Sequence, residues 1–124
     1  MKSKEIRLSG TTDTSGDLVV NATRPVFGLL YAVRWVDDTF ANGVDAVIST
    51  QSHEAAATLL TLTNADDDAW YYPRDVVHDA TGGALLGTHG GDRALPLFAG
   101  VPRLVVSNGG SKLTGGCVLF YYEE

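Results

Sequence analysis

The stretch LLYAVRWV, residues 29–36, decides the fold class of this chain. Successive side chains of a strand point to opposite faces. One face then carries Leu29, Tyr31, Val33 and Trp35, and the other carries Leu30, Ala32, Arg34 and Val36. Both faces are largely apolar, which is typical of a central strand covered on both sides. We therefore predict an all-β domain built around residues 29–36.

Shorter segments of the same kind lie on both sides of this strand, separated by turn-forming residues such as NADDD at 64–68 and NGG at 108–110. The pattern predicts strands at 5–8, 17–22, 44–50, 58–63, 69–72, 103–107 and 117–122. About seven to nine short strands are typical of an antiparallel β-sandwich or a jelly-roll-like barrel. We expect the last two strands to pair as a hairpin.

Three segments are less regular. Residues 51–57 fit either one turn of helix capped by Ser52 or a simple connection. Residues 74–102 are rich in glycine and predict either a functional loop or a set of short edge strands. Residues 1–10 are interpreted as an N-terminal arm that could add to a neighbour's sheet. The whole chain, 1–124, is expected to form a single β domain.

Alternation within the predicted strands also selects a core. Its expected members are Leu18, Val20, Tyr31, Val33, Trp35, Ile48, Leu60, Leu62, Leu104, Val106, Val118 and Phe120.

Composition narrows the functional classes. The chain has 124 residues and a formal net charge of -6, with nine basic residues scattered along it. Clustered Lys and Arg are needed to bind phosphates, so nucleic acid is not an expected partner. Cys117 is the single cysteine, which rules out an intrachain disulfide and suggests a reducing compartment. No signal peptide is expected, because the N-terminal stretch MKSKEIRLSG is charged and lacks an apolar segment. No membrane span is expected either, because the apolar runs are far shorter than roughly 18 residues.

Candidate chemistry is sparse. His53, His78 and His89 each have an acidic neighbour, but none falls in a metal-binding spacing. Three consecutive aspartates, 66–68, lack the spacers of a calcium loop and predict a solvated turn. Cys117 lies in an apolar strand with no neighbouring base, so we expect a buried thiol. The sequence thus predicts no catalytic residue, no metal, no cofactor and no enzyme activity.

Aromatic residues supply the candidate binding site. A strand must send the consecutive Trp70, Tyr71 and Tyr72 to opposite faces, and Tyr and Trp are enriched at protein interfaces and sugar-binding surfaces. We predict a partner-binding surface made of Trp70, Tyr72, Arg74, Leu97 and Phe98.

Several stretches resemble the small β-rich proteins found with the head genes of tailed bacteriophages. The matching marks are GLLYAV from Gly28, the YYPR…H…G segment over 71–82 and the VLFYYEE ending. The resemblance implies a virion structural protein, and within that class a capsid decoration (cement) protein that binds between capsomers. It also implies a dimer or trimer, a major capsid or other virion protein as partner, and a place on the capsid surface after synthesis in the host cytoplasm.

Three hypotheses follow from these patterns. The first is the capsid decoration protein, with another phage head-tail or tail accessory protein as a close variant. The second is a carbohydrate-binding module that uses the aromatic residues 70–72 as a platform. The third is a small metal-dependent enzyme in which at least two of the three histidines meet.

Overall fold

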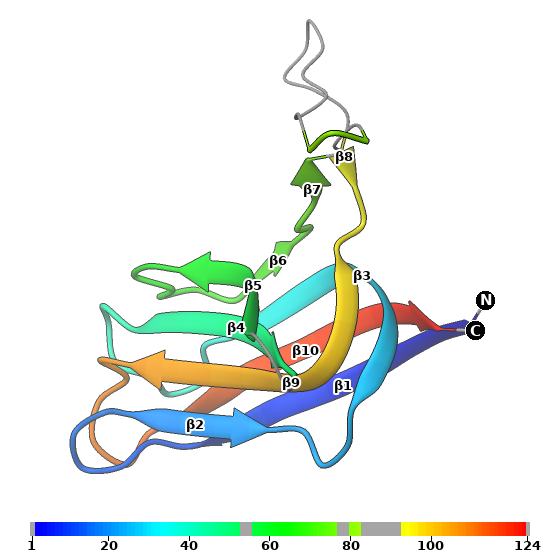
Figure 1. The fold of residues 1–124 in the computed structure, drawn as a ribbon. Helices are drawn as coiled ribbons and strands as arrows, with labels where there is room; N and C mark the ends of the chain where they lie inside the picture. Colours follow the sequence, from blue (N-terminus) through cyan, green and yellow to red (C-terminus); the bar gives the residue numbers. More distant parts are fainter. Residues whose placement is uncertain (1, 53–55, 77–79, 83–92, 124) are drawn as a thin grey trace, which may run out of the picture.

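The computed structural model describes residues 2–52, 56–76, 80–82 and 93–123, and it confirms the all-β class (Figure 1). Within these residues the chain forms strands joined by turns and loops, and no helix. The strands are β1 (Lys2–Thr11), β2 (Leu18–Asn21), β3 (Val26–Val36), β4 (Asp45–Gln51), β5 (Ala56–Leu62), β6 (Ala69–Tyr71), β7 (Asp75–Val76), β8 (Arg93–Ala94), β9 (Leu97–Ser107) and β10 (Thr114–Glu123).

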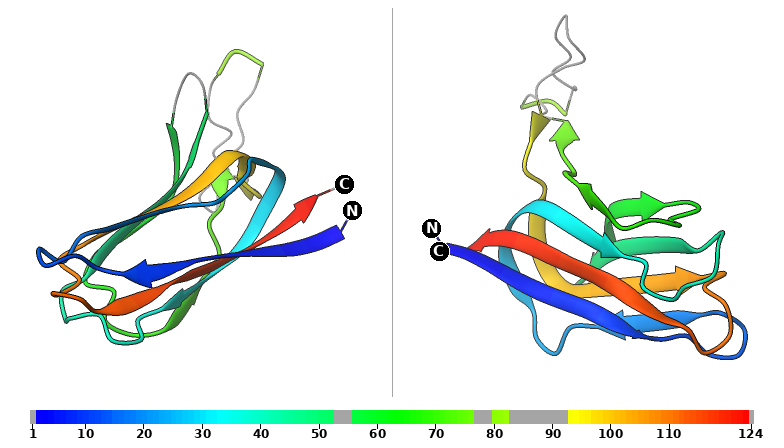
Figure 2. Two further views of the ribbon diagram at one scale, coloured as in Figure 1. Left: turned by 90° about the horizontal axis from the view of Figure 1, so that it is seen from below. Right: turned by 180° about the vertical axis from the view of Figure 1, so that it is seen from behind.

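Eight of these strands make two antiparallel layers that face each other as a sandwich (Figures 1 and 2). One layer, the β10 sheet, has the order β1-β10-β3-β6. The other, the β9 sheet, has the order β2-β9-β4-β5. The layers join where Val26–Leu29 of β3 pairs with Leu97–Gly100 of β9. The remaining ladder, β7 with β8, projects away from the sandwich in Figure 1.

Four strands are longer than the short strands we expected. β1 and β10 have 10 residues each, and β3 and β9 have 11 each. β9 is long because it serves both layers: it pairs with β3 up to Gly100 and with β4 from Val101 onward. Gly100 has a φ of 114°, a conformation open to glycine at little cost, so the strand can turn from one layer to the other there.

The predicted N-terminal arm belongs to the domain itself, because residues 2–11 pair along their whole length with β10 and form a sheet edge. Its addition to a neighbour's sheet stays a prediction. The expected hairpin of the last two strands is wrong. β9 and β10 form no hairpin, because they lie in different sheets. The connection between them crosses from one layer to the other, and Gly109 binds neighbouring loops through hydrogen bonds to Gly16 and Ala41.

The two other irregular segments of the sequence consist of strand ends, short strands and residues that the structure does not describe. In residues 51–57, Gln51 ends β4 and Ala56 begins β5, while His53 lies outside the described residues. Within residues 74–102, β7 and β8 are short strands as predicted, whereas Leu97–Pro102 belongs to the long central strand β9, and residues 77–79 and 83–92 lie outside the described residues.

The core lies between the two sheets. Trp35 is fully buried, stacks on Phe40 at 5.7 Å between ring centroids, and donates a 2.9 Å hydrogen bond from Nε1 to the Ala65 carbonyl. Six of the expected core residues are buried there: Val33, Trp35, Ile48, Leu62, Leu104 and Val106. Val118 is also buried, but on the outer face of the β10 sheet, because its neighbours Cys117 and Leu119 point into the core. Three more are half-buried against the core cluster: Leu18, Val20 and Leu60.

Tyr31 and Phe120 were expected in the core, and this expectation is wrong. The register between β3 and β10 shifts, so that Phe120 faces Ala32 while Tyr121 faces Leu30. Tyr31 is the extra residue of this β-bulge, and a bulge re-aims side chains. Leu30 therefore takes the inward position and is fully buried. Tyr31 instead packs against Phe120 on the outer face of the β10 sheet.

Candidate functional site

The outer face of the β10 sheet, turned away from the core, carries a continuous apolar surface. We call this surface the aromatic face and define it by Phe27, Leu29, Tyr31, Trp70, Tyr72, Leu97, Phe120 and Tyr122. Four of its side chains are strongly exposed: Phe27 (74%), Tyr72 (62%), Leu97 (55%) and Trp70 (49%). Single exposed apolar residues are ordinary on a protein surface, but a contiguous group usually marks an interaction site.

The rings of the aromatic face contact one another across three strands. The Trp70 and Phe120 ring centroids are 5.3 Å apart, and those of Phe120 and Tyr31 are 6.2 Å apart. Tyr31 stacks on Tyr122 at 4.4 Å with 26° between the ring planes. These contacts hold the rings of Trp70, Phe120, Tyr31 and Tyr122 in place, so this part of the aromatic face is ordered before any partner arrives.

Polar groups fix the rings further. The Ser3 Oγ lies 2.7 Å from the Tyr31 hydroxyl, in hydrogen-bond contact. The Arg34 guanidinium sits over the Trp70 ring at 5.4 Å and forms an ion pair with Asp68 at 3.8 Å. Cation–π contacts of this kind are strongest where water is excluded, so a partner covering Trp70 would strengthen the contact.

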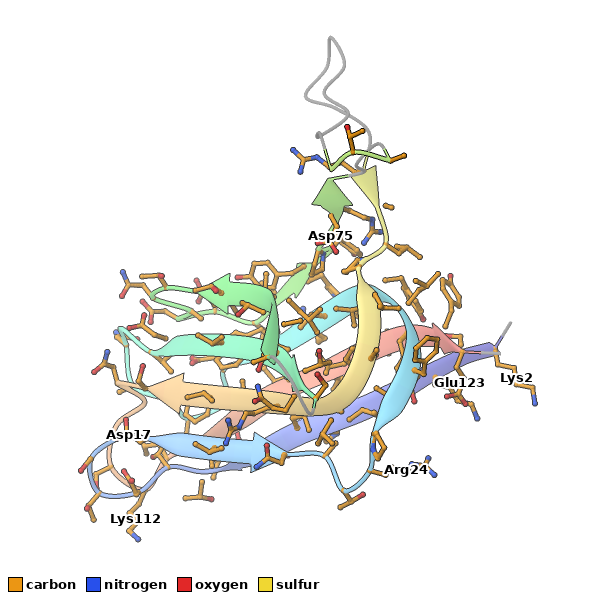
Figure 3. The ribbon with its side chains drawn as sticks, in the orientation of Figure 1. Lys2, Asp17, Arg24, Asp75, Lys112 and Glu123 are labelled. Carbon is orange, nitrogen blue, oxygen red and sulfur yellow. The ribbon has the colours of Figure 1, made fainter. Side chains whose placement is uncertain are left out.

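An open groove of about 620 Å³ continues the aromatic face at the end of the molecule where the termini lie. Its apolar lining includes Phe27, Leu29 and Leu97, and its charged lining comes from Arg24 and Glu123. Figure 3 labels Glu123 beside Lys2, and Arg24 below them on the loop between β2 and β3. The groove therefore offers apolar contact between two opposite charges.

Four of the five predicted partner residues are exposed in the structure. Trp70, Tyr72 and Leu97 belong to the aromatic face, and Arg74 is exposed beside them, donating a 3.2 Å hydrogen bond to the Tyr31 carbonyl. Phe98 was a wrong choice, because it is fully buried.

The position of Phe98 follows from strand alternation. Leu97 points out, so Phe98 points in and packs edge-on against Tyr121 at 5.0 Å.

Three aspartates, Asp37, Asp66 and Asp68, lie close together, and hydrogen bonds give two of them a structural role. Asp68 Oδ1 accepts from the Asp37 backbone N–H at 2.8 Å, and Asp66 Oδ1 accepts from the Gly43 N–H at 2.7 Å. Burial raises the pKa of Asp37, and the neighbouring Asp66 and Asp68 carboxylates raise it further. Within the described residues, no three His, Cys, Asp or Glu side chains converge in a way that could hold a metal ion.

The remaining candidates for chemistry are the Cys117 thiol and the three histidines. Cys117 is buried in β10, and desolvation raises its pKa to about 12, so the thiol stays protonated and unreactive near neutral pH. His53, His78 and His89 lie outside the described residues, so the histidine hypothesis remains a prediction.

Sequence reasoning missed Phe27 and Leu29 and placed Tyr31 and Phe120 in the core. Phe27 could have been found, because it alternates with Leu29 once the strand is extended back to Val26. The outward position of Tyr31 depends on the bulge, and no local pattern signals it.

No protein-family model matches the chain, and no curated protein matches it either, so function has to be argued from this surface. Among the described residues, no helix has the length and hydropathy needed to cross a membrane.

Proposed function

We propose that the chain is a non-enzymatic structural protein of a tailed-bacteriophage virion, of the capsid decoration type, and that it docks on the capsid shell protein through the aromatic face. One observation carries the proposal. Of the six large apolar side chains that are strongly exposed in the described residues, four lie on the aromatic face.

The chemistry of this face suits a protein partner. Trp, Tyr and Arg dominate the binding energy of protein interfaces, and Trp70, Tyr72, Arg34 and Arg74 occur here together. Four of the rings already pack on one another, so their binding would lose little side-chain entropy. A sandwich with a well-packed core suits a protein that strengthens a shell by adding contacts, since binding stabilises both partners by mass action.

Quantitative mass spectrometry of gradient-purified particles of the encoding phage tests the role. The proposal expects the chain to be present in a fixed ratio to the major capsid protein. It also expects added chain to cosediment with particles that lack it, and Trp70→Ala to weaken that binding. Absence of the chain from purified particles would contradict the virion role.

Binding to carbohydrate is the second candidate, because Trp70 and Tyr72 are exposed on one surface. The contacts of Trp70 favour it less: Arg34 lies over one ring face and Phe120 packs against the same ring. A glycan array followed by a tryptophan-fluorescence titration separates the two candidates. A glycan whose binding is lost in Tyr72→Ala would favour the carbohydrate-binding module.

A further inference from the structure

One edge of the β10 sheet is open. β1 pairs with β10 over residues 2–11, and no second strand bonds to its other side within the described part of the chain. Because β10 takes one side, the peptide groups of alternate residues of β1 point to this open edge. A groove of about 270 Å³ runs beside it, lined by residues 6–9 and 20–24.

We propose that this edge pairs with β1 of a second copy of the chain, antiparallel, about a two-fold axis that passes beside Ile6. The inference does not depend on the docking of the aromatic face.

The bonding pattern restricts how two copies of β1 can pair. Only alternate residues offer N–H and C=O groups to the open edge, so an even-numbered residue must face an even-numbered one and an odd residue an odd one. A two-fold axis at Lys4, Glu5 or Arg7 would place that residue against its own copy, and like charges directly opposite each other are destabilising.

The axis at Ile6 is the one that matches charges. It places Glu5 opposite Arg7 of the other copy, and the symmetry repeats this pair. Both side chains are exposed, whereas Leu8 between Arg7 and Ser9 is buried, so the two charge pairs lie on the outer face. Neither Glu5 nor Arg7 makes an ion pair inside the part of the chain described here.

Edge strands usually carry charges that prevent pairing with other chains. Here the charges at positions 5 and 7 attract in the one symmetric register, and the half-buried Ile6 meets its own copy on the core side. Paired residues of a sheet point to the same side, so the two aromatic faces would lie on the same side of one continuous sheet.

Charge reversal at positions 5 and 7 tests the register by sedimentation velocity across a concentration series. In the paired strands, Glu5→Arg sets two arginines opposite each other, and Arg7→Glu sets two glutamates opposite each other. Each single variant should raise the dimer dissociation constant about tenfold or more, because attraction becomes repulsion in two places. The double variant Glu5→Arg/Arg7→Glu should return to within about threefold of the wild type.

Mixing provides the sharpest control. An equimolar mixture of the Glu5→Arg chain and the Arg7→Glu chain should form a heterodimer. One chain then carries arginine at both positions and the other carries glutamate at both, so each of the two cross-strand pairs joins an arginine to a glutamate. Recovery on mixing also shows that both variants are folded. Lys112→Glu makes the same change in net charge as Arg7→Glu at the far end, and it should leave the dimer unchanged.

Two results would overturn the proposal. One is a wild-type chain that stays monomeric up to about 100 μM, far above the concentration of a stable dimer. The other is a dimer whose dissociation constant does not respond to either single reversal. Particle binding by the monomeric variants would leave the docking of the aromatic face intact, so the two proposals fail separately.

Discussion

The outer faces of the two sheets differ, although both sheets have four main strands and both pack their other face on the same core. On the β9 sheet, Val19, Val105 and Val47 form a short row, and Asn21, Arg103 and Ser49 form the polar row beside it. On the β10 sheet, the corresponding face carries aromatic rings that pack on one another.

This difference shows which apolar faces the fold requires and which it does not. A two-layer sandwich needs one apolar face per sheet, and a solvated outer face normally alternates to polar or β-branched side chains. The β9 sheet follows that pattern. The fold does not require a second apolar face on the β10 sheet, and the strong exposure of Phe27, Tyr72 and Leu97 on that face supports the proposed role in binding.

The largest expected effect compares two tryptophans on opposite faces of the β10 sheet. Trp35→Ala should lower the free energy of unfolding by about 3–5 kcal/mol, because it removes a fully buried ring and its hydrogen bond to Ala65. Trp70→Ala should cost about 1–2 kcal/mol, because about half of that side chain is already in water. Urea denaturation measures both, and equal losses would break the comparison.

Binding should show the opposite order. Trp70→Ala should weaken binding to phage particles about tenfold to a hundredfold, as expected for an interface tryptophan. Val47→Ser on the β9 sheet should change binding by less than about twofold. Cosedimentation at several concentrations gives both values, and stronger dependence on Val47 would move the site to the other sheet.

Glycines at the junction between the two sheets should give the next largest effect, a loss of folding stability on substitution. A Cβ at Gly28 would overlap the Tyr122 carbonyl oxygen, and one at Gly100 would lie 2.5 Å from the Gln51 carbonyl oxygen. Either glycine-to-alanine change should cost about 1–3 kcal/mol, because backbone must move. A Cβ at Gly10 would lie 3.1 Å from the flexible end of Leu18, so Gly10→Ala should lower the free energy of unfolding far less. Thermal melts of the three variants measure these losses.

Asp37 gives the smallest effect, and its sign depends on pH. The pKa of Asp37 is raised above 3.8 in the folded chain, so at neutral pH its ionised carboxylate destabilises the folded state relative to the unfolded state. Asp37→Asn should therefore stabilise the chain at pH 7 by about 0.5 kcal/mol. The gain should shrink as the pH falls through the folded pKa toward 3.8, where the wild-type carboxyl takes up its proton. A gain that persists at about pH 3 would contradict this cause.

Sequence reasoning found what depends on local alternation. The strand around Val33 and Trp35 reads correctly, because two apolar faces and flanking turn residues are local signals. The exposed Trp70 and Tyr72 follow from alternation through three aromatic residues. Which of Leu97 and Phe98 points outward depends on the register of β9, and the irregular glycine-rich sequence before this strand gives no local signal for that register.

What sequence reasoning missed depends on which strands pair. The bulge that turns Tyr31 outward exists only in the pairing of β3 with β10. The connection around Gly109 looked like a hairpin turn, but its hydrogen bonds go to loops distant in the sequence. A turn signal marks where a chain reverses and does not say which sheet receives the next strand.

The most direct test of the central claim is hydroxyl-radical footprinting of the chain, free and bound to phage particles. Binding through the aromatic face predicts that Phe27, Trp70 and Tyr72 lose reactivity on binding, while Val19 and Val47 stay as reactive as in the free chain. Protection of Val19 and Val47, with Trp70 and Tyr72 unchanged, would contradict the account.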